Sequence, residues 1–183
     1  MTAATEAQPV SYPTDEDLMA RVLRCYRPNC RYLTAMTVSV TGSGSGTDIA
    51  VRGFAGLAIG ESCYIDDTGH LNAVEVNISY NQMCYYVIAK LVQEQLGPVF
   101  STWTMADFWR HQLPDILITK LVSRFRRPID RSCFFGEFEF GHVKRRRFDP
   151  AGPSLVALDT AFRFWDDRDG CADGEVVAAI VSS

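Results

Sequence analysis

The sequence predicts one α+β domain in which an antiparallel sheet wraps around a single long helix. The longest regular stretch, residues 72–96, carries apolar side chains on nearly every side, and a helix of that kind is buried on most sides. Strand-like runs rich in β-branched and aromatic residues flank it, two before and four after. A sheet curled around one helix buries both the helix and one face of the strands.

The N-terminal part predicts a tail followed by a helix. Residues 1–13 are expected to form a flexible tail, and residues 14–183 a single domain. Thr14 precedes three acidic residues and an apolar pattern at helical spacing. This pattern predicts a helix that begins there and ends near Arg27–Pro28.

Two strands joined by a turn are expected next. Residues 32–40 and 49–57 have strand composition, and the glycine- and serine-rich residues 41–48 predict a flexible turn between them. Gly53 and Gly56 permit a bulge or a close approach of another element.

A polar loop over residues 60–71 leads into the long helix. A short helix is predicted over residues 104–113, and the remaining strands are expected over 116–125, 133–140, 155–165 and 175–181. This order matches the hotdog arrangement, which normally pairs through sheet edges. We therefore expect a homodimer or a higher homo-oligomer.

Composition narrows the class of protein. A chain of 183 residues with 47% hydrophobic residues can bury a core without a metal or disulfide scaffold. No apolar run approaches the roughly 20 residues that span a bilayer, and the N-terminus does not resemble a signal peptide. The six cysteines form no CxxC motif and predict reduced thiols. We expect a cytoplasmic protein with no membrane partner, no metal and no cofactor.

The net charge of −4 conceals a basic segment. Residues 120–147 hold nine basic and three acidic residues, while the rest of the chain is acidic. An acidic protein with one basic block is a poor nonspecific binder of nucleic acid. The block suits a CoA phosphate or an acidic carrier protein, and for Lys144–Arg147 a simple solvent-facing role is equally plausible.

Several motifs carry a resemblance to a known family. They are Cys30–Leu33, Ile59–Ile65, Thr68–Glu75, Asn81–Gln82 and the strand-to-turn segment Ser123–Ile129. With these motifs the chain resembles the FcoT-like thioesterase family from about residue 18 to the C-terminus.

The resemblance implies an activity and a set of residues. Members of the family are described as long-chain acyl-CoA thioesterases. Relatives in isonitrile-lipopeptide and β-amino-acid pathways add glycine to a (2E)-enoyl thioester on an acyl carrier protein, and some then hydrolyse the thioester. A family cavity lined by two tyrosines and two asparagines implies Tyr64, Asn72 and Asn81 here, with Tyr26 the weaker match.

The start of the long helix offers the chemistry that such a reaction needs. First-turn amides and the helix dipole stabilise negative charge on a thioester oxygen, both in hydrolysis and in conjugate addition. Tyr64 can hydrogen-bond to the substrate, and His70 can accept the ammonium proton of glycine. Asn72 and Glu75 also fit a capping box, in which case both serve the helix alone. Glu75 could be a catalytic base, but the resemblance argues against a catalytic carboxylate.

Other residues remain open at this level. Asn81 either contacts a polar substrate atom or binds neighbouring backbone. Arg31, Lys120 and Arg124 are unranked candidates for holding the glycine carboxylate. Ser62 lacks a nucleophile elbow, which disfavours a serine hydrolase.

Three functions therefore compete. The favoured one is Michael addition of glycine to the β-carbon of an enoyl thioester on acyl carrier protein or CoA, followed by hydrolysis. The alternatives are a fatty acyl-CoA thioesterase without amine addition and a noncatalytic acyl-binding module.

Overall fold

The computed structural model describes residues 8–42, 49–147 and 154–181. The helices are α1 (Glu16–Val22), α2 (Ala73–Gln93) and α3 (Met105–His111), with short 3-10 turns at Leu23–Cys25, Pro28–Cys30 and Phe100–Thr102. The strands are β1 (Val10–Tyr12), β2 (Leu33–Thr41), β3 (Ala50–Leu57), β4 (Ile116–Arg127), β5 (Phe134–Arg147), β6 (Ser154–Trp165) and β7 (Cys171–Val181).

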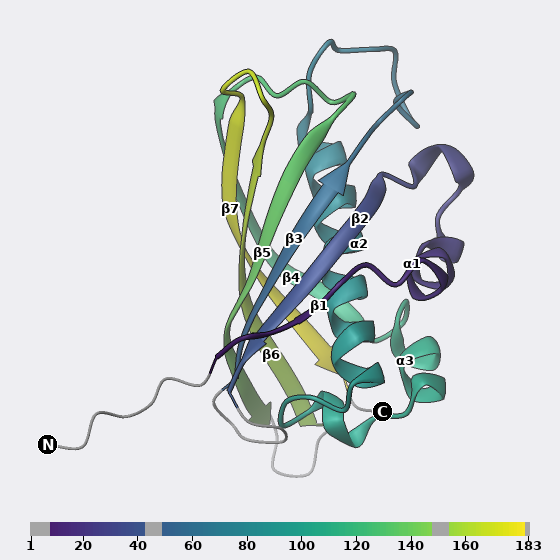
Figure 1. Ribbon diagram of the computed structural model, residues 1–183, viewed down its shortest axis with the longest axis vertical. Helices are drawn as coiled ribbons and strands as arrows, with labels where there is room; N and C mark the ends of the chain where they lie inside the picture. The colour runs from purple at the N-terminus through teal and green to yellow at the C-terminus, as the bar shows by residue number, and fades with distance from the viewer. Residues whose placement is uncertain (1–7, 43–48, 148–153, 182–183) are drawn as a thin grey trace, which may run out of the picture.

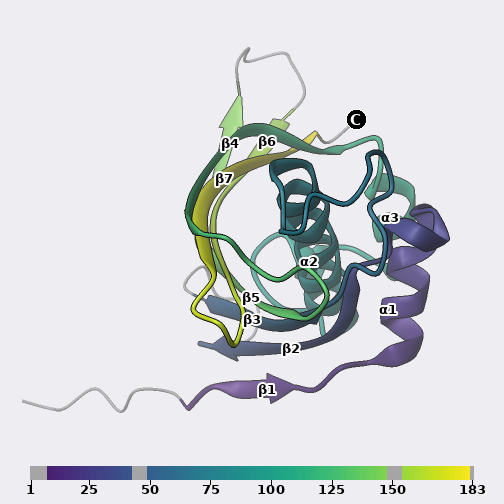
Figure 2. The ribbon, with the colours of Figure 1, turned by 90° about the horizontal axis from the view of Figure 1, so that it is seen from above.

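The strands form one antiparallel sheet that curls around α2 (Figure 1). Their order is β1-β2-β3-β5-β6-β7-β4, so β1 and β4 are the two edges of the sheet. Seen from above, α2 lies inside the curl, while α1 and α3 lie on the side that the sheet leaves open (Figure 2). This is the hotdog fold, as the sequence predicts.

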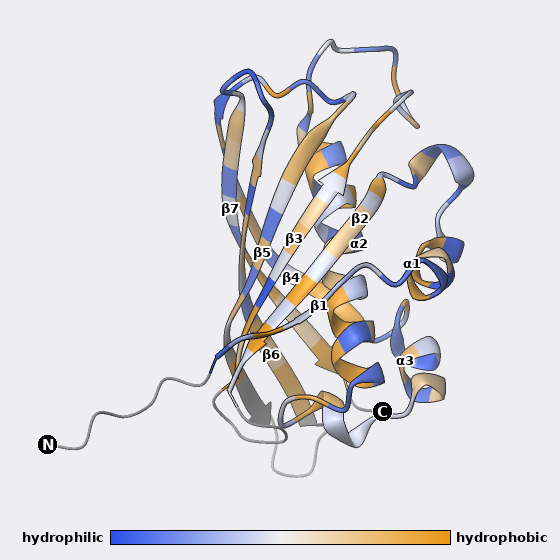
Figure 3. Cartoon of the chain, in the orientation of Figure 1, coloured by the Kyte–Doolittle hydropathy of each residue, from blue (hydrophilic) through white to orange (hydrophobic). Residues whose placement is uncertain are grey.

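The core forms between α2 and the inner face of the sheet. Every residue from Gln82 to Val92 is buried, because the sheet faces one side of the helix while α1 and α3 cover another. Hydrophobic residues accordingly gather on α2 and on the strands next to it (Figure 3). The ring of Tyr80 packs against Phe138 and Phe162, and its hydroxyl lies 2.7 Å from Thr160 Oγ1. This buried tyrosine therefore has a polar partner inside the core.

Gly53 makes the close approach that the sequence predicts. A Cβ atom at this position would lie 2.3 Å from Met36 Cε and 3.2 Å from Val87 Cγ2. The absence of a side chain lets β3 lie directly against α2.

The N-terminal prediction needs two corrections. Residues 10–12 are not part of a tail, because β1 pairs with β2 from Val10–Val40 to Tyr12–Val38. Helix α1 is capped by Asp15, whose side chain accepts from the Leu18 amide, rather than by Thr14. The Thr14 hydroxyl instead accepts from the Met36 amide of β2. Residues 1–7 lie outside the described part of the chain.

Two strands are longer than the sequence suggests. β5 continues from residue 140 to 147 after an irregular register between Phe140 and Val143, so the basic run lies on a strand. Residues 148–153, between β5 and β6, and most of the predicted turn at 41–48 lie outside the described residues. β7 begins at Cys171 rather than at residue 175, because Asp166 already closes the turn by accepting from the amides of Arg168 and Gly170.

Within the described residues, none of the helices combines the length and the apolar character needed to cross a membrane.

Candidate active site

The first turn of α2 is organised by a capping box. Asn72 Oδ1 accepts from the amides of Val74 and Glu75 at 3.0 and 3.2 Å, and Glu75 Oε2 accepts from the Asn72 amide at 3.1 Å. The predicted cap is thus confirmed, and it fixes the side chain of Asn72 at the N-terminal end of α2, residues 72–75, which we call the helix mouth.

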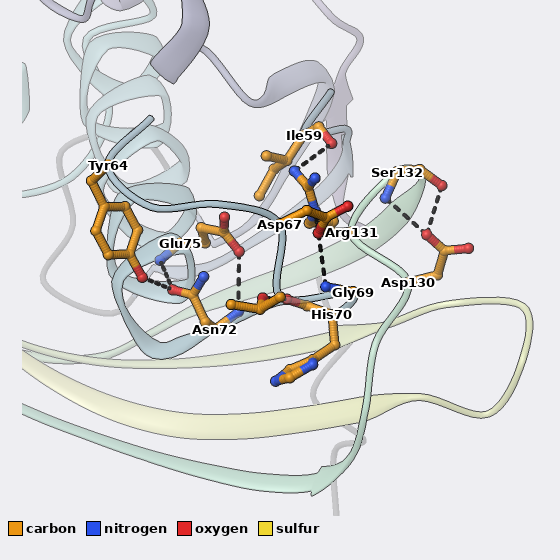
Figure 4. A network of polar contacts seen from close by, with 11 residues as sticks. Ile59, Tyr64, Asp67, Gly69, His70, Asn72, Glu75, Asp130, Arg131 and Ser132 are labelled. Carbon is orange, nitrogen blue, oxygen red and sulfur yellow. Dashed lines mark hydrogen bonds and ion pairs between the residues drawn. The ribbon is translucent and has the colours of Figure 1, made fainter. Parts of the chain in front are cut away.

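Tyr64 contacts the same residue. Its hydroxyl donates to Asn72 Oδ1 at 2.7 Å, which gives that oxygen three donors (Figure 4). The side-chain nitrogen of Asn72, Nδ2, is buried and has no hydrogen-bond partner among the described residues. Tyr64 therefore fixes the orientation of Asn72, and the Asn72 Nδ2 group remains available as a donor.

The loop that carries Tyr64 is held at both ends. The Ile59 amide donates to the carbonyl of Arg131, and the Leu71 amide donates to the carbonyl of Ile129. The side chain of Arg131 adds an ion pair with Asp67 at 2.9 Å, and Asp67 also accepts from the Gly69 amide. These two donors hold the pKa of Asp67 below its usual value. Both ends of the loop are thus fixed to the turn between β4 and β5.

Glu75 is fully buried beneath this loop. One carboxylate oxygen completes the capping box, and the other, Oε1, has no partner among the described residues. The pKa of Tyr64 is raised, mainly by desolvation and further by the charge of Glu75. A buried carboxylate oxygen without a partner is costly, so it indicates a polar ligand or water at this position.

Tyr32 lies beside the loop at the start of α2, and Gln82 holds its backbone from about 15 Å further along the helix. The Tyr32 hydroxyl donates to Cys63 Sγ at 3.3 Å, and its pKa is raised by burial and then by Cys63 and Glu75. Gln82 Oε1 accepts from the amides of Tyr32 and Leu33, both at 2.9 Å. These bonds hold the start of β2 against α2.

A groove of about 320 Å³ opens beside the helix mouth. Its walls are His70, Leu71, Asn72 and Ala73 on one side and Phe125, Arg126, Arg127 and Pro128 on the other. Ala73 is the first residue of α2, and first-turn amides lack acceptors within their own helix. The cap engages the amides of Val74 and Glu75, so the groove gives a substrate access to Ala73, the first residue of the helix.

The structure brings only some of the predicted residues together. Tyr64 and Asn72 are in direct contact, and His70 lines the groove with its ring directed away from Glu75 (Figure 4). Asn81 instead donates to Asn77 at 3.2 Å. Nine positions at about 3.6 residues per turn place Asn81 on the face of α2 opposite Asn72.

Tyr26 lies away from this group. It is packed against the core, and burial together with Tyr85, Cys25 and Cys84 raises its pKa. Cys84 is twelve residues beyond Asn72, or about 18 Å along the helix. Tyr32 is the tyrosine that the structure places beside the Tyr64 loop.

The three cation candidates do not line the groove. Arg31 donates to the carbonyl of Tyr26, Arg124 pairs with Asp173 at 3.5 Å, and Lys120 is exposed on β4. Arg126 and Arg127 line the groove instead. Both arginines come directly after Phe125 and belong to the basic segment over residues 120–147.

The sequence analysis missed several members of the site: Tyr32, Cys63, Ser79, Gln82 and Arg131. One signal for them existed. Polar residues at 72, 75, 79 and 82 share one face of an otherwise apolar helix, a spacing that indicates a common polar surface. Tyr32 and Arg131 reach the site from distant segments, and no local pattern identifies them.

A central helix wrapped by a sheet, with a polar N-terminal end beside a groove, is typical of enzymes of the hotdog thioesterase class. The FcoT-like thioesterase domain matches residues 21–180, and this chain belongs to that family.

Similar proteins share one description. A (2E)-enoyl-ACP glycyltransferase from Streptomyces coeruleorubidus is 52% identical over 170 residues, which cover 92% of this chain and 98% of that protein. A protein of the same name from Mycobacterium tuberculosis is 33% identical over 174 residues, covering 93% of this chain and 88% of that protein. One from Mycobacterium marinum is 33% identical over 170 residues, covering 91% and 86% respectively.

Proposed function

We propose that this enzyme adds the nitrogen of glycine to the β-carbon of a (2E)-enoyl group held as a thioester on acyl carrier protein. A C–N bond forms at the β-carbon, the C=C bond becomes single, and the α-carbon gains a proton. No bond to sulfur breaks in this step. The description shared by the relatives supports this reaction.

One observation carries the proposal at the level of the site. Among the described residues, the buried Nδ2 group of Asn72 is a donor without a partner, and the helix start that carries it lines a groove. An enolate oxygen formed by conjugate addition would accept from Asn72 Nδ2 and from the amide of Ala73, and the helix dipole would stabilise its charge. Tyr64 would act by positioning Asn72.

The groove also suits the other parts of the substrate. Arg126 is paired with Asp173 at 2.9 Å, so Arg127 is the cation that we propose for an acidic carrier protein or the glycine carboxylate near the start of α2. His70 lies on the same wall and would contact the substrate there. Asn81 and Tyr26 do not reach the start of α2. We propose that they contact the substrate through its acyl chain.

Hydrolysis of the adduct is a further part of the proposal. Water would attack the thioester carbonyl carbon, the resulting oxyanion would accept from the donors that bind the enolate oxygen, and the C–S bond would break as the carrier thiol leaves with a proton. The released β-amino acid would enter the biosynthesis of a β-amino-acid or isonitrile-lipid product.

Incubation of the enzyme with a 2-enoyl thioester of acyl carrier protein, with and without glycine, tests the function. Intact-protein mass spectrometry should show a gain of one glycine on the carrier only when glycine is present. Free fatty acid formed regardless of glycine would instead support a plain thioesterase. Tight acyl binding without turnover would support a noncatalytic module.

A further inference from the structure

Buried polar atoms without partners gather at the start of α2. Within the described residues, Ser62 Oγ, Asn72 Nδ2, Glu75 Oε1 and Ser79 Oγ are buried and make no hydrogen bond. Asn72, Glu75 and Ser79 occupy one face of α2, since they are spaced three and four residues apart. Ser62 belongs to the loop that covers this face. Unpaired groups of this density are rare in folded proteins and indicate a binding position.

Glu75 carries the charge of this group. Its side chain is fully buried, so its second oxygen is sheltered from bulk water. Figure 4 shows the carboxylate between Tyr64 and the Arg131–Asp67 ion pair. Arg131 and Tyr32 both lie within electrostatic range of it, but the Arg131 guanidinium donates to Asp67 and to the Ile59 carbonyl. The nearby cation is thus already engaged, and Glu75 Oε1 is left for another.

We propose that Glu75 Oε1 binds the amino group of glycine and accepts its proton, with the hydroxyls of Ser62 and Ser79 completing an amino-acid subsite. This assignment rests on the proposed function and adds a subsite and a catalytic carboxylate to it. An ammonium group is a donor of three hydrogen bonds, which matches a carboxylate oxygen and two hydroxyl oxygens. The glycine carboxylate then points outward, toward Asn72 and the groove.

The proton balance of the addition closes on this one carboxylate. Glu75 takes a proton from the ammonium of glycine and frees the nitrogen lone pair. The amine attacks the β-carbon, becomes a secondary ammonium, and leaves an enolate on the thioester. Protonated Glu75 returns its proton to the α-carbon and is regenerated. No oxidant, metal or further reactant is needed.

Glu75 is better placed for this role than His70. The His70 ring lies on the outer wall of the groove, whereas Glu75 shares a hydrogen bond with the backbone of Asn72. The base and the donor for the enolate therefore sit within one helical turn of each other.

Glu75→Gln tests the assignment without removing the cap, since glutamine also serves in a capping box. We expect the variant to fold with an unchanged melting temperature and to lose at least about 100-fold in kcat/KM for glycine, the range of lost general acid–base catalysis. The KM for the enoyl thioester should not change. Asp107→Asn is the matched control, because Asp107 is the corresponding residue of the α3 capping box and lies on another element.

A second measurement separates proton transfer from a structural role. The loss of kcat/KM in Glu75→Gln, relative to the wild type, should become smaller as the pH rises through the pKa of the glycine amine. At neutral pH the loss should also be smaller with aminoacetonitrile, an amine that is already unprotonated there. A deficit that is equal for both amines and at every pH would overturn the assignment.

Ser79→Ala keeps the test open if Glu75→Gln fails to fold. Removing a buried hydroxyl that has no ligand leaves stability unchanged or raises it. If the Ser79 hydroxyl binds the amino group, Ser79→Ala should raise the KM for glycine several-fold at unchanged stability. An unaltered KM would argue against the subsite. Wild-type kinetics in both variants would overturn the inference alone, whereas absence of adduct with the wild-type enzyme would overturn the proposed function as well.

Discussion

Asn72 uses the two ends of one side chain for different purposes. Its side-chain oxygen accepts from Tyr64 and two backbone amides, which fixes the amide plane, while its buried side-chain nitrogen has no partner in the described part of the chain. The sequence analysis posed helix capping and catalysis as alternatives for this residue. The geometry allows both, because the cap engages only the acceptor.

Asn72→Ala should separate these roles. Loss of the cap should lower the free energy of unfolding by about 1 kcal/mol. Loss of the donor should lower the rate of addition by at least about 100-fold, as for other donors to an oxyanion. Thr104→Ala, which removes the cap of α3, is the control and should match the stability loss in chemical denaturation with no loss of rate. Equal small effects of both variants on activity would leave Asn72 as a cap only.

Asp166 shows how a single carboxylate can close a turn. It accepts from the amides of Asp130, Arg168 and Gly170 at 2.6 to 2.8 Å. Burial acts to raise its pKa, but the three amide donors outweigh burial and the pKa is lowered from 3.8. The turns before β5 and β7 are joined through this residue.

Asp166→Asn should lower the free energy of unfolding at neutral pH by about 2 kcal/mol, because the Asp130 amide loses its acceptor. The carboxylate is more acidic in the folded state than in the unfolded state. Its contribution is therefore present above pH 3.8 and disappears as the pH falls through the lowered pKa. Urea denaturation at neutral and acid pH should show the two proteins converging in acid. The exposed neighbour Asp167, changed to Asn, should have no such effect.

At the scale of elements, local periodicity predicts the long helix and most of the strands. It fails where pairing depends on a distant partner. β1 has three residues and forms because β2 offers a free edge, and β7 starts early because Asp173 and Gly174 pair with β6. The same limit applies to the site. Tyr64 and Asn72 lie in one continuous motif, whereas Tyr32 meets Cys63 across 31 residues and Arg131 meets Asp67 across 64.

Gly174 lies inside β7, one residue before the start that the sequence predicts for this strand. A Cβ atom there would lie 2.3 Å from the carbonyl oxygen of Val122 and 2.4 Å from Phe162 Cζ. Gly174→Ala should therefore force β4 and β7 apart and reduce stability by about 1–3 kcal/mol. Gly60→Ala, with nothing within 4 Å of the added atom, is the control in thermal unfolding. Equal melting temperatures would show that the sheet can shift at no cost.

At the scale of the molecule, the two sheet edges differ. β1 is only three residues long, whereas β4 has twelve and exposes Leu117 and Phe125. The exposed edge of β4 offers backbone groups for pairing, and the suitable part is its mostly apolar first half, because the second half carries Arg124, Arg126 and Arg127. We propose that the expected homodimer forms along β4.

Leu117→Lys should weaken this association, because it places a charge on the paired edge. Sedimentation velocity should show the wild type as a dimer or larger and the variant shifted toward monomer. Leu113→Lys, at a more exposed position that follows α3, is the control. A wild type that sediments as a monomer, or a variant that remains dimeric, would contradict pairing along β4.

The loop over residues 59–71 is closed at its base, because both of its ends bind the single turn at 129–131. A base fixed in this way, with Asp67 bound to Arg131 as a further anchor, leaves the exposed tip at Ile65 and Asp66 as the place for new side chains or insertions. Natural relatives could diversify their acyl or carrier preference at this tip while retaining the same reaction. Grafting tips between homologues would be a direct way to redesign substrate choice in this scaffold.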